Sequence, residues 1–194
     1  MTQVDTTIGT ASERQRMVAT LVTTFSADPL MRWFYPDPRA YLAHFPGFIE
    51  RFAGRAFEEG TADSIDGVAG AALWLPPGVR GDDDALIAFM QASMSEEQHD
   101  ALGELAEQLD RYHPDEPHWY LALLGIDPPH QSRGFGAEMI RPRLEQCDRE
   151  GRAAHLVSST SRNHSFYRRH GFEIMDEVQV GDAPPVWPML RSPR

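Results

Sequence analysis

The first part of the chain places hydrophobic residues with the period of an α-helix. Between residues 13 and 25 the apolar side chains recur three and four positions apart, which predicts an amphipathic helix that ends before Asp28-Pro29. A second stretch of this kind, residues 38–59, has an apolar stripe rich in aromatic side chains. We therefore expect two helices to open the fold, after a flexible start over residues 1–12, which are rich in Thr.

A buried strand and two further helices are expected next. Asp66-Gly67 predicts a hairpin turn, and residues 68–75 form an apolar run that is typical of a buried strand. Three aspartates at 82–84 indicate a helix start, because acidic side chains stabilise the free N–H groups at that end. Ser95 and Gln98 have the spacing of a capping box and predict another helix start.

Beyond residue 117 the pattern changes to alternating strands and helices. Strands are expected at 119–126, 155–159, 172–180 and 186–190, and helices at 134–150 and 163–170. Two β-to-α crossovers in succession favour an α/β fold whose mixed sheet contains a parallel pair. Since no repeat or low-complexity linker interrupts the 194 residues, a single domain over 1–194 is expected.

The charge balance restricts the partners. The chain has 18 basic and 29 acidic residues, a net charge of −11. Nucleic acids and anionic membranes are bound through clustered cations, so neither is expected as a partner. A small cationic substrate would be attracted by the negative electrostatic potential of the protein. No signal peptide and no run of ~20 apolar residues is visible, so a cytoplasmic protein is expected by default. The oligomeric state stays open, with a homodimer as one option.

The sequence predicts no metal site. Cys147 is the single cysteine, which excludes a disulfide framework and a cysteine-based zinc site. The eight histidines show no His-Glu-x-x-His or similar ligand spacing.

A glycine-containing loop follows the strand expected at 119–126. The loop and the start of the next helix comprise Gln131, Ser132, Arg133, Gly134, Phe135 and Gly136. Glycines allow a tight turn and a close ligand approach, and the free N–H groups at a helix N-terminus favour an anion. Arg133 adds a charge-assisted contact. We expect a pyrophosphate here, and a P-loop is excluded because the chain contains no lysine.

A second motif opens the next helix. It begins at Asn163, 29 positions after Gly134, and continues through Tyr167 to Gly171-Phe172. Together the two motifs resemble the GNAT superfamily of acyl-CoA-dependent N-acyltransferases, firmly over residues 119–180. The resemblance implies a twisted mixed sheet, flanked by helices and split between two parallel strands where CoA inserts. It further implies that residues 13–117 form a variable acceptor-side half and residues 118–194 the acyl-CoA-binding half.

The resemblance also implies a mechanism, in which an acetyl group passes from acetyl-CoA to an amine directly, within a ternary complex. Backbone N–H groups at Leu124, Gly125 and Ile126 would bind the oxyanion. Tyr167 takes the place of the family's general acid and would protonate the CoA thiolate. The resemblance further implies that Asn163 and Phe166 contact the acyl-CoA.

The base is the part of this mechanism that the motifs do not supply. Strand alternation puts His118, Tyr120 and Ala122 on one face and Trp119, Leu121 and Leu123 on the other. Many relatives place a Glu at the position of Tyr120. His118 is the best replacement as a base, assisted by Glu116 or by a chain of water molecules. Its alternative role is that of a structural histidine held by hydrogen bonds.

A narrower similarity concerns the puromycin N-acetyltransferase branch. The shared features are His118-Trp119-Tyr120-Leu121, Pro142 within a helix, Arg162-Asn163 and Trp187-Pro188-Met189. Similar sequences often have Glu where this chain has Val157, so a carboxylate near the substrate amine is missing.

Three functions follow from these features. The first is an acetyl-CoA-dependent N-acetyltransferase that acts on a small-molecule amine. The alternatives are a non-catalytic acyl-CoA-binding or regulatory module of the same fold, and a protein or peptide N-acetyltransferase. The helices expected between residues 77 and 117 favour a covered pocket over an open peptide groove.

Overall fold

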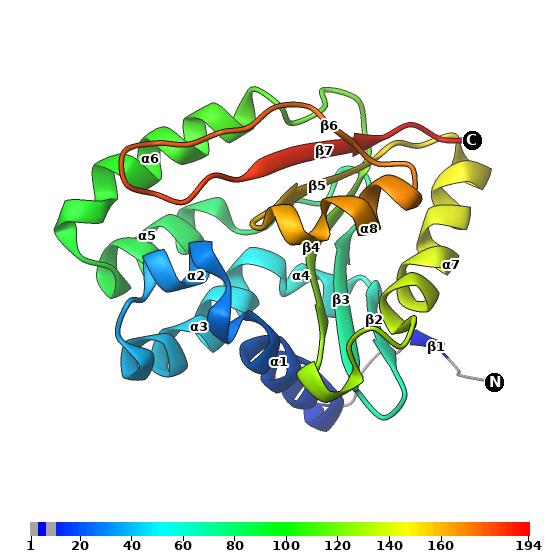
Figure 1. The fold of residues 1–194 in the computed structure, drawn as a ribbon, viewed down its shortest axis with the longest axis horizontal. Helices are drawn as coiled ribbons and strands as arrows, with labels where there is room; N and C mark the ends of the chain where they lie inside the picture. The colour runs from blue at the N-terminus through cyan, green and yellow to red at the C-terminus, as the bar shows by residue number, and fades with distance from the viewer. Residues whose placement is uncertain (1–3, 7–10) are drawn as a thin grey trace.

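The computed structural model describes residues 4–6 and 11–194, which build one mixed β-sheet with helices packed on both faces (Figure 1). The strands are β1 (Val4–Thr6), β2 (Ala62–Ile65), β3 (Gly70–Leu75), β4 (Trp119–Ile126), β5 (Ala154–Ser158), β6 (Glu173–Ile174) and β7 (Trp187–Arg191). Their order in the sheet is β1-β2-β3-β4-β5-β7-β6. Among the strands of the described residues, only β4 and β5 are parallel neighbours, so the expected parallel pair is confirmed.

The sheet opens between β4 and β5. The two strands pair only through Trp119 with Ala154 and Tyr120 with His155. Beyond Tyr120 they diverge, which leaves the β5-facing edge of β4 without a strand partner as far as Ile126 (Figure 1). The gap therefore lies directly before the glycine-containing loop that follows β4.

A β-bulge in β4 changes which residues share a face. Leu73 lies opposite Leu123 and Trp74 opposite Leu121, so Ala122 is an extra residue without a partner in β3. Strict alternation predicts Leu123 on the face of Trp119 and Leu121. This prediction is wrong: Leu123 packs in the same cluster as Tyr120 and Ala122, because the bulge reverses the alternation.

Eight α-helices lie in the described part of the chain. They are α1 (Ala11–Thr24), α2 (Pro29–Phe34), α3 (Pro38–Ala53), α4 (Arg55–Glu58), α5 (Asp83–Ser93), α6 (Glu96–Asp110), α7 (Phe135–Glu150) and α8 (His164–Arg169). Within the start expected to be flexible, residues 4–6 form β1 and α1 begins at Ala11, whereas residues 1–3 and 7–10 lie outside the described part of the chain. The helix expected over 38–59 is confirmed, with a break at Gly54.

Two hydrophobic clusters cover the two faces of the sheet. One joins α1, α2, α3 and α5 to the sheet through residues such as Leu21, Phe45 and Leu73. The other joins α7 and α8 to the opposite face through Met139 and Tyr167. The core thus holds the helices that follow β4 and β5 against one face and the N-terminal helices against the other.

The C-terminal region departs from the predicted strand at 172–180. Only Glu173–Ile174 form a strand, β6, and Val178 makes an isolated antiparallel bridge to Val186. The valines of this segment pack instead in a third cluster with Leu105 of α6. Burial against a helix therefore replaces sheet pairing here, and β7 pairs with β5 directly.

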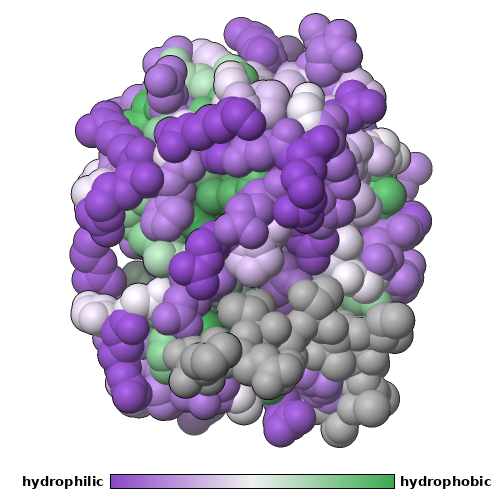
Figure 2. Space-filling model, turned by 90° about the vertical axis from the view of Figure 1, so that its right-hand side faces the viewer, coloured by the Kyte–Doolittle hydropathy of each residue, from purple (hydrophilic) through white to green (hydrophobic). Residues whose placement is uncertain are grey.

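The surface around α7 is mostly hydrophilic, with hydrophobic side chains visible in recesses between charged ones (Figure 2). Among the described residues, no helix has the length and apolar character needed to cross a bilayer.

Candidate active site

The loop between β4 and α7 presents unpaired backbone N–H groups. Within the described residues, none of the N–H groups of residues 132–137 donates a hydrogen bond, and the first to do so is that of Glu138, to the carbonyl of Gly134. Gly134 caps α7 with φ = +87°, a conformation that favours glycine. Ser132 also has a positive φ of 61°. The loop thus aims several donors and the positive end of a sixteen-residue helix at one place.

Side chains of the loop hold its shape. Gln131 donates from Nε2 to the carbonyl of Ile126 at 3.0 Å, which ties the loop to the end of β4. Phe135 is buried under α7 and stacks on His130, and the Arg133 guanidinium lies 5.4 Å from the centre of its ring. Gln131 and Phe135 therefore shape the predicted anion site, while Arg133 is the cation beside it.

The loop packs against the second motif. A Cβ on Gly136 would lie 3.3 Å from Cζ of Phe166, so glycine permits the close approach of α7 to α8. Phe166 itself is half-buried and lies against His170 and Tyr167. Asn163 is exposed at the end of a 3₁₀ turn, Ser161–Asn163, just before α8. The structure thus brings the two sequence motifs together on one side of the gap.

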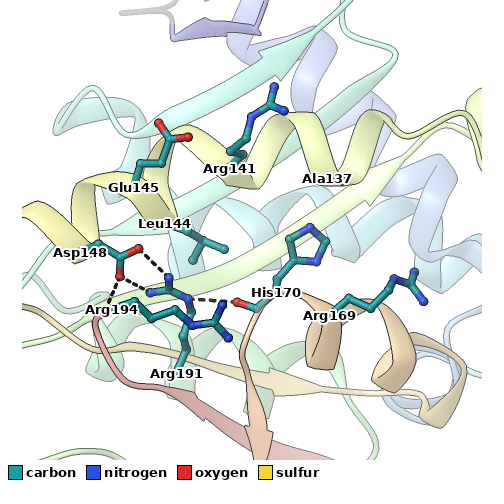
Figure 3. Close-up of a pocket in the computed structure, with 9 residues that line it drawn as sticks. All are labelled: Ala137, Arg141, Leu144, Glu145, Asp148, Arg169, His170, Arg191 and Arg194. Atoms are coloured by element: carbon teal, nitrogen blue, oxygen red, sulfur yellow. Dashed lines mark hydrogen bonds and ion pairs between the residues drawn. The ribbon is translucent and has the colours of Figure 1, made fainter.

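A basic pocket lies beside this contact. A cavity of about 280 Å³ is lined by residues of α7, α8 and the C-terminal segment (Figure 3). Arg191 is paired there with Asp148, at 2.8 and 2.7 Å, and donates from Nε to the carbonyl of His170. Arg141 and Arg169 form no ion pair with any described residue and remain available to an anion.

The predicted oxyanion donors lie on the open stretch of β4. Leu124, Gly125 and Ile126 pair with β3 on one side and face the gap on the other. A Cβ on Gly125 would come within 3.0 Å of Leu21 and 3.1 Å of Thr24, so α1 packs tightly over the strand at this point. The predicted oxyanion site is therefore held against α1.

Tyr167 is buried on α8, with 8% of its surface exposed. Its hydroxyl forms no hydrogen bond with a described residue and is not among the fully buried polar atoms that lack a partner, so it keeps access to solvent. Burial raises the pKa of Tyr167, and the charge of Asp28 adds to this effect. A neutral phenol with a free O–H is the form that can donate a proton.

Asp28 is a functional candidate that the sequence did not reveal. Its Oδ1 accepts hydrogen bonds from the N–H groups of Leu30 and Met31, at 3.0 and 3.1 Å, and so caps α2. Its other oxygen accepts one from the hydroxyl of Ser159, which follows β5. Burial raises the pKa of the Asp28 carboxyl, and these hydrogen bonds lower it in part. A half-buried carboxylate therefore lies close enough to influence the pKa of Tyr167.

His118 lies elsewhere. It precedes β4, and Nδ1 donates to the carbonyl of Glu116 at 2.8 Å, since a carbonyl can only accept. Leu124 is six residues further along the strand, a separation of about 20 Å at ~3.3 Å per residue. No described contact joins His118 to Tyr167, so a proton could reach His118 from the predicted acyl site only through water.

A family model agrees with these features. The model described as acetyltransferase (GNAT) family matches residues 30–172 of the chain. The chain belongs to the GNAT acetyltransferase family. The match begins at residue 30, far ahead of the motifs at 119–180, so the helical first half is part of the family domain too.

Individual proteins are similar to this chain in sequence or in fold. An uncharacterized N-acetyltransferase from Schizosaccharomyces pombe is 23% identical over 94% of this chain and 81% of that protein. A structure described as histone acetyltransferase HPA2 and related acetyltransferase from Corynebacterium glutamicum has a TM-score of 0.69 and 22% identity, and covers 100% of this chain and 97% of its own. Arylalkylamine N-acetyltransferase 2 from Aedes aegypti has a TM-score of 0.65 and 12% identity, with coverages of 100% and 99%.

These findings confirm the fold and the enzyme class predicted from the sequence. The protein is a GNAT acetyltransferase with a mixed sheet flanked by helices.

Proposed function

We propose that this protein transfers an acetyl group from acetyl-CoA to the amine of a small molecule, directly and within a ternary complex. The observation that carries the proposal is the position of Asp28, which is held to Ser159 after β5 and lies near enough to Tyr167 for its charge to raise the pKa of that phenol. One group is suited to bind and deprotonate an amine, the other to protonate a thiolate. The free N–H groups of residues 132–137 lie at the end of the gap between β4 and β5.

The donor would extend along the gap from the loop. Its pyrophosphate would accept hydrogen bonds from the N–H groups of residues 132–136, with Arg133 as the neighbouring cation. A further phosphate of the nucleotide would suit the basic pocket of Arg141 and Arg169. The pantetheine arm would lie along β4 near Asn163 and Phe166, where the edge of the strand has no partner.

The acceptor would enter from the side of α2. An ammonium group is attracted by the net charge of −11 and would pair with Asp28. Arylalkylamine N-acetyltransferase, a protein of similar fold, acts by its name on small amines. The raised pKa of Asp28 brings its proton affinity closer to the operating pH, where a base works best.

The chemical step balances with these two groups. The ammonium loses its first proton to solvent before the attack. The neutral amine nitrogen attacks the thioester carbonyl, and the oxyanion accepts hydrogen bonds from N–H groups at Leu124 to Ile126. The C–S bond then breaks, Tyr167 protonates the leaving thiolate, and the excess proton on nitrogen passes to Asp28. Asp28 afterwards releases this proton to solvent, and the Tyr167 phenolate takes one up from solvent, which restores both groups for the next turnover. His118 remains the alternative base predicted from the sequence, acting through a water relay.

The test measures CoA release from acetyl-CoA with a panel of amines that includes aminonucleosides, arylalkylamines, polyamines and amino acids. Turnover with at least one amine, and intersecting initial-rate lines, would support direct transfer, whereas parallel lines indicate a covalent intermediate. Acetyl-CoA binding without turnover would favour the non-catalytic module. Turnover with peptides alone would favour a protein acetyltransferase.

A further inference from the structure

Three histidines that are distant in the sequence meet at the paired end of β4 and β5. His113 and His118 belong to the segment between α6 and β4, and His155 lies on β5. The ring centres are 4.6 Å apart for His113 and His118, 5.4 Å for His113 and His155, and 5.8 Å for His118 and His155. One ring nitrogen from each lies within 4.8 Å of the other two.

His155 is buried without a hydrogen bond. Only 1% of its surface is exposed, and neither ring nitrogen has a partner among the described residues. Buried polar groups are nearly always satisfied, because an unpaired one loses its hydration without compensation. Tyr120 stacks on the ring, 5.5 Å away between centres, and holds it in place. A buried imidazole with two free nitrogens therefore indicates a ligand that is not part of the chain.

His118 is oriented in the manner of a metal ligand. Its Nδ1 carries the proton that it donates to the carbonyl of Glu116. Nε2 is consequently left with a free lone pair. A ring N–H bound to a carbonyl is the usual support behind a metal-binding histidine, because it fixes the tautomer and the ring orientation.

The charge state also suits a metal. Burial is the largest effect that lowers the pKa of His155, to about 3, and the two neighbouring histidines lower it further. The pKa of His113 is lowered by burial, by His118 and by Arg80, against the opposing charges of Asp110 and Asp83. These effects favour the neutral imidazole at His113 and His155, which is the form that binds metal.

We propose that His113, His118 and His155 bind a single divalent transition-metal ion of the zinc type. Three imidazole nitrogens are a known zinc ligand set, with a fourth position for water. A tetrahedral site with bonds of ~2.05 Å needs ligand nitrogens about 3.3 Å apart. The three nitrogens lie within 4.8 Å of one another, so small rotations of the rings would bring them to this separation. The ion would tie the segment before β4 to β5 at the point where the sheet halves join.

The test uses full-length protein without a histidine tag, stripped with a chelator and titrated with Zn²⁺ by calorimetry. One ion per chain is expected, and Zn²⁺ at about 100 times its Kd should raise Tm by about 5–10 °C. His113→Asn and His155→Asn should each weaken binding by at least about tenfold. His99→Asn, on α6 and outside the cluster, is the matched control and should bind like the wild type.

Two results would overturn the proposal: no stoichiometric binding by the wild type, or equal binding by the wild type and His113→Asn. Because His113 is only half-buried, its variant should still fold even if the variant of the buried His155 does not, and binding can then be measured on the His113 variant. Four-coordinate Co²⁺ gives a second readout, since its visible absorption should appear in the wild type and vanish in His113→Asn. Because metal binding occupies Nε2 of His118, it also excludes that residue as the base.

Discussion

Asp28→Asn is the substitution that tests the proposed site most directly. It removes the negative charge and the ability to take a proton, but an amide oxygen can still accept the hydrogen bonds of Leu30 and Met31. Asn and Asp are equivalent helix caps, so the stability should change by less than about 1 kcal/mol, or about 2–4 °C in Tm. Loss of a base should lower kcat/KM by about 10²–10⁴, equivalent to about 2.7–5.4 kcal/mol.

Asp37→Asn is the matched control for this substitution. Asp37 caps α3 in the same way, accepting from the N–H groups of Arg39 and Ala40 at 2.8 and 2.9 Å, and it is exposed. Its variant should keep wild-type turnover. Equal kcat/KM for Asp28→Asn and the wild type, measured where chemistry limits the rate, would refute the assignment of Asp28.

The pH dependence supplies a second check. The folded-state pKa of Asp28 is raised, so its contribution to stability is present below the unfolded value of about 3.8 and is lost as pH rises through the folded value. As the pH rises from the unfolded to the folded pKa of Asp28, the free energy of unfolding of the wild type should therefore fall relative to that of Asp28→Asn. The acidic limb of kcat/KM should be absent in Asp28→Asn and retained in His118→Gln. The opposite result would identify His118 as the base.

Two other variants probe the donor side of the site. Tyr167→Phe should lower kcat by about 10²–10⁴. Acetyl-CoA binding and folding should stay intact, because the hydroxyl makes no hydrogen bond within the described residues. An unchanged kcat would show that Tyr167 is only a core residue. Gly136→Asp brings a Cβ to 3.3 Å from Phe166 and a negative charge to the predicted anion site. It should reduce the rise in Tm caused by acetyl-CoA, and an equal rise in both proteins would contradict the proposed pyrophosphate site.

The second half of the chain was the more predictable part. The apolar run of β4, the glycines of the loop and the Gly151 that ends α7 with a positive φ are local signals, and the structure places each element as expected. α2 was missed because Asp28-Pro29 marks a helix start as well as the end of the preceding one.

Features that depend on pairing between distant strands were not predictable. The bulge at Ala122 exists only relative to β3, and it moves Leu123 to the other face. The histidine cluster depends on the parallel register of Tyr120 with His155, which no local spacing reveals. Likewise, Asp28 becomes a site residue through Ser159, 131 positions away.

The narrow junction between β4 and β5 has a consequence for hydrogen exchange. Strands β1 to β4 come from residues 4–126 and strands β5 to β7 from residues 154–191, and the two groups share only two residue pairs. Regions with few shared backbone contacts can open as separate cooperative units. Amides on the open edge of β4 should therefore exchange quickly in the free protein, and a donor that occupies the gap would slow them by joining the two units into one.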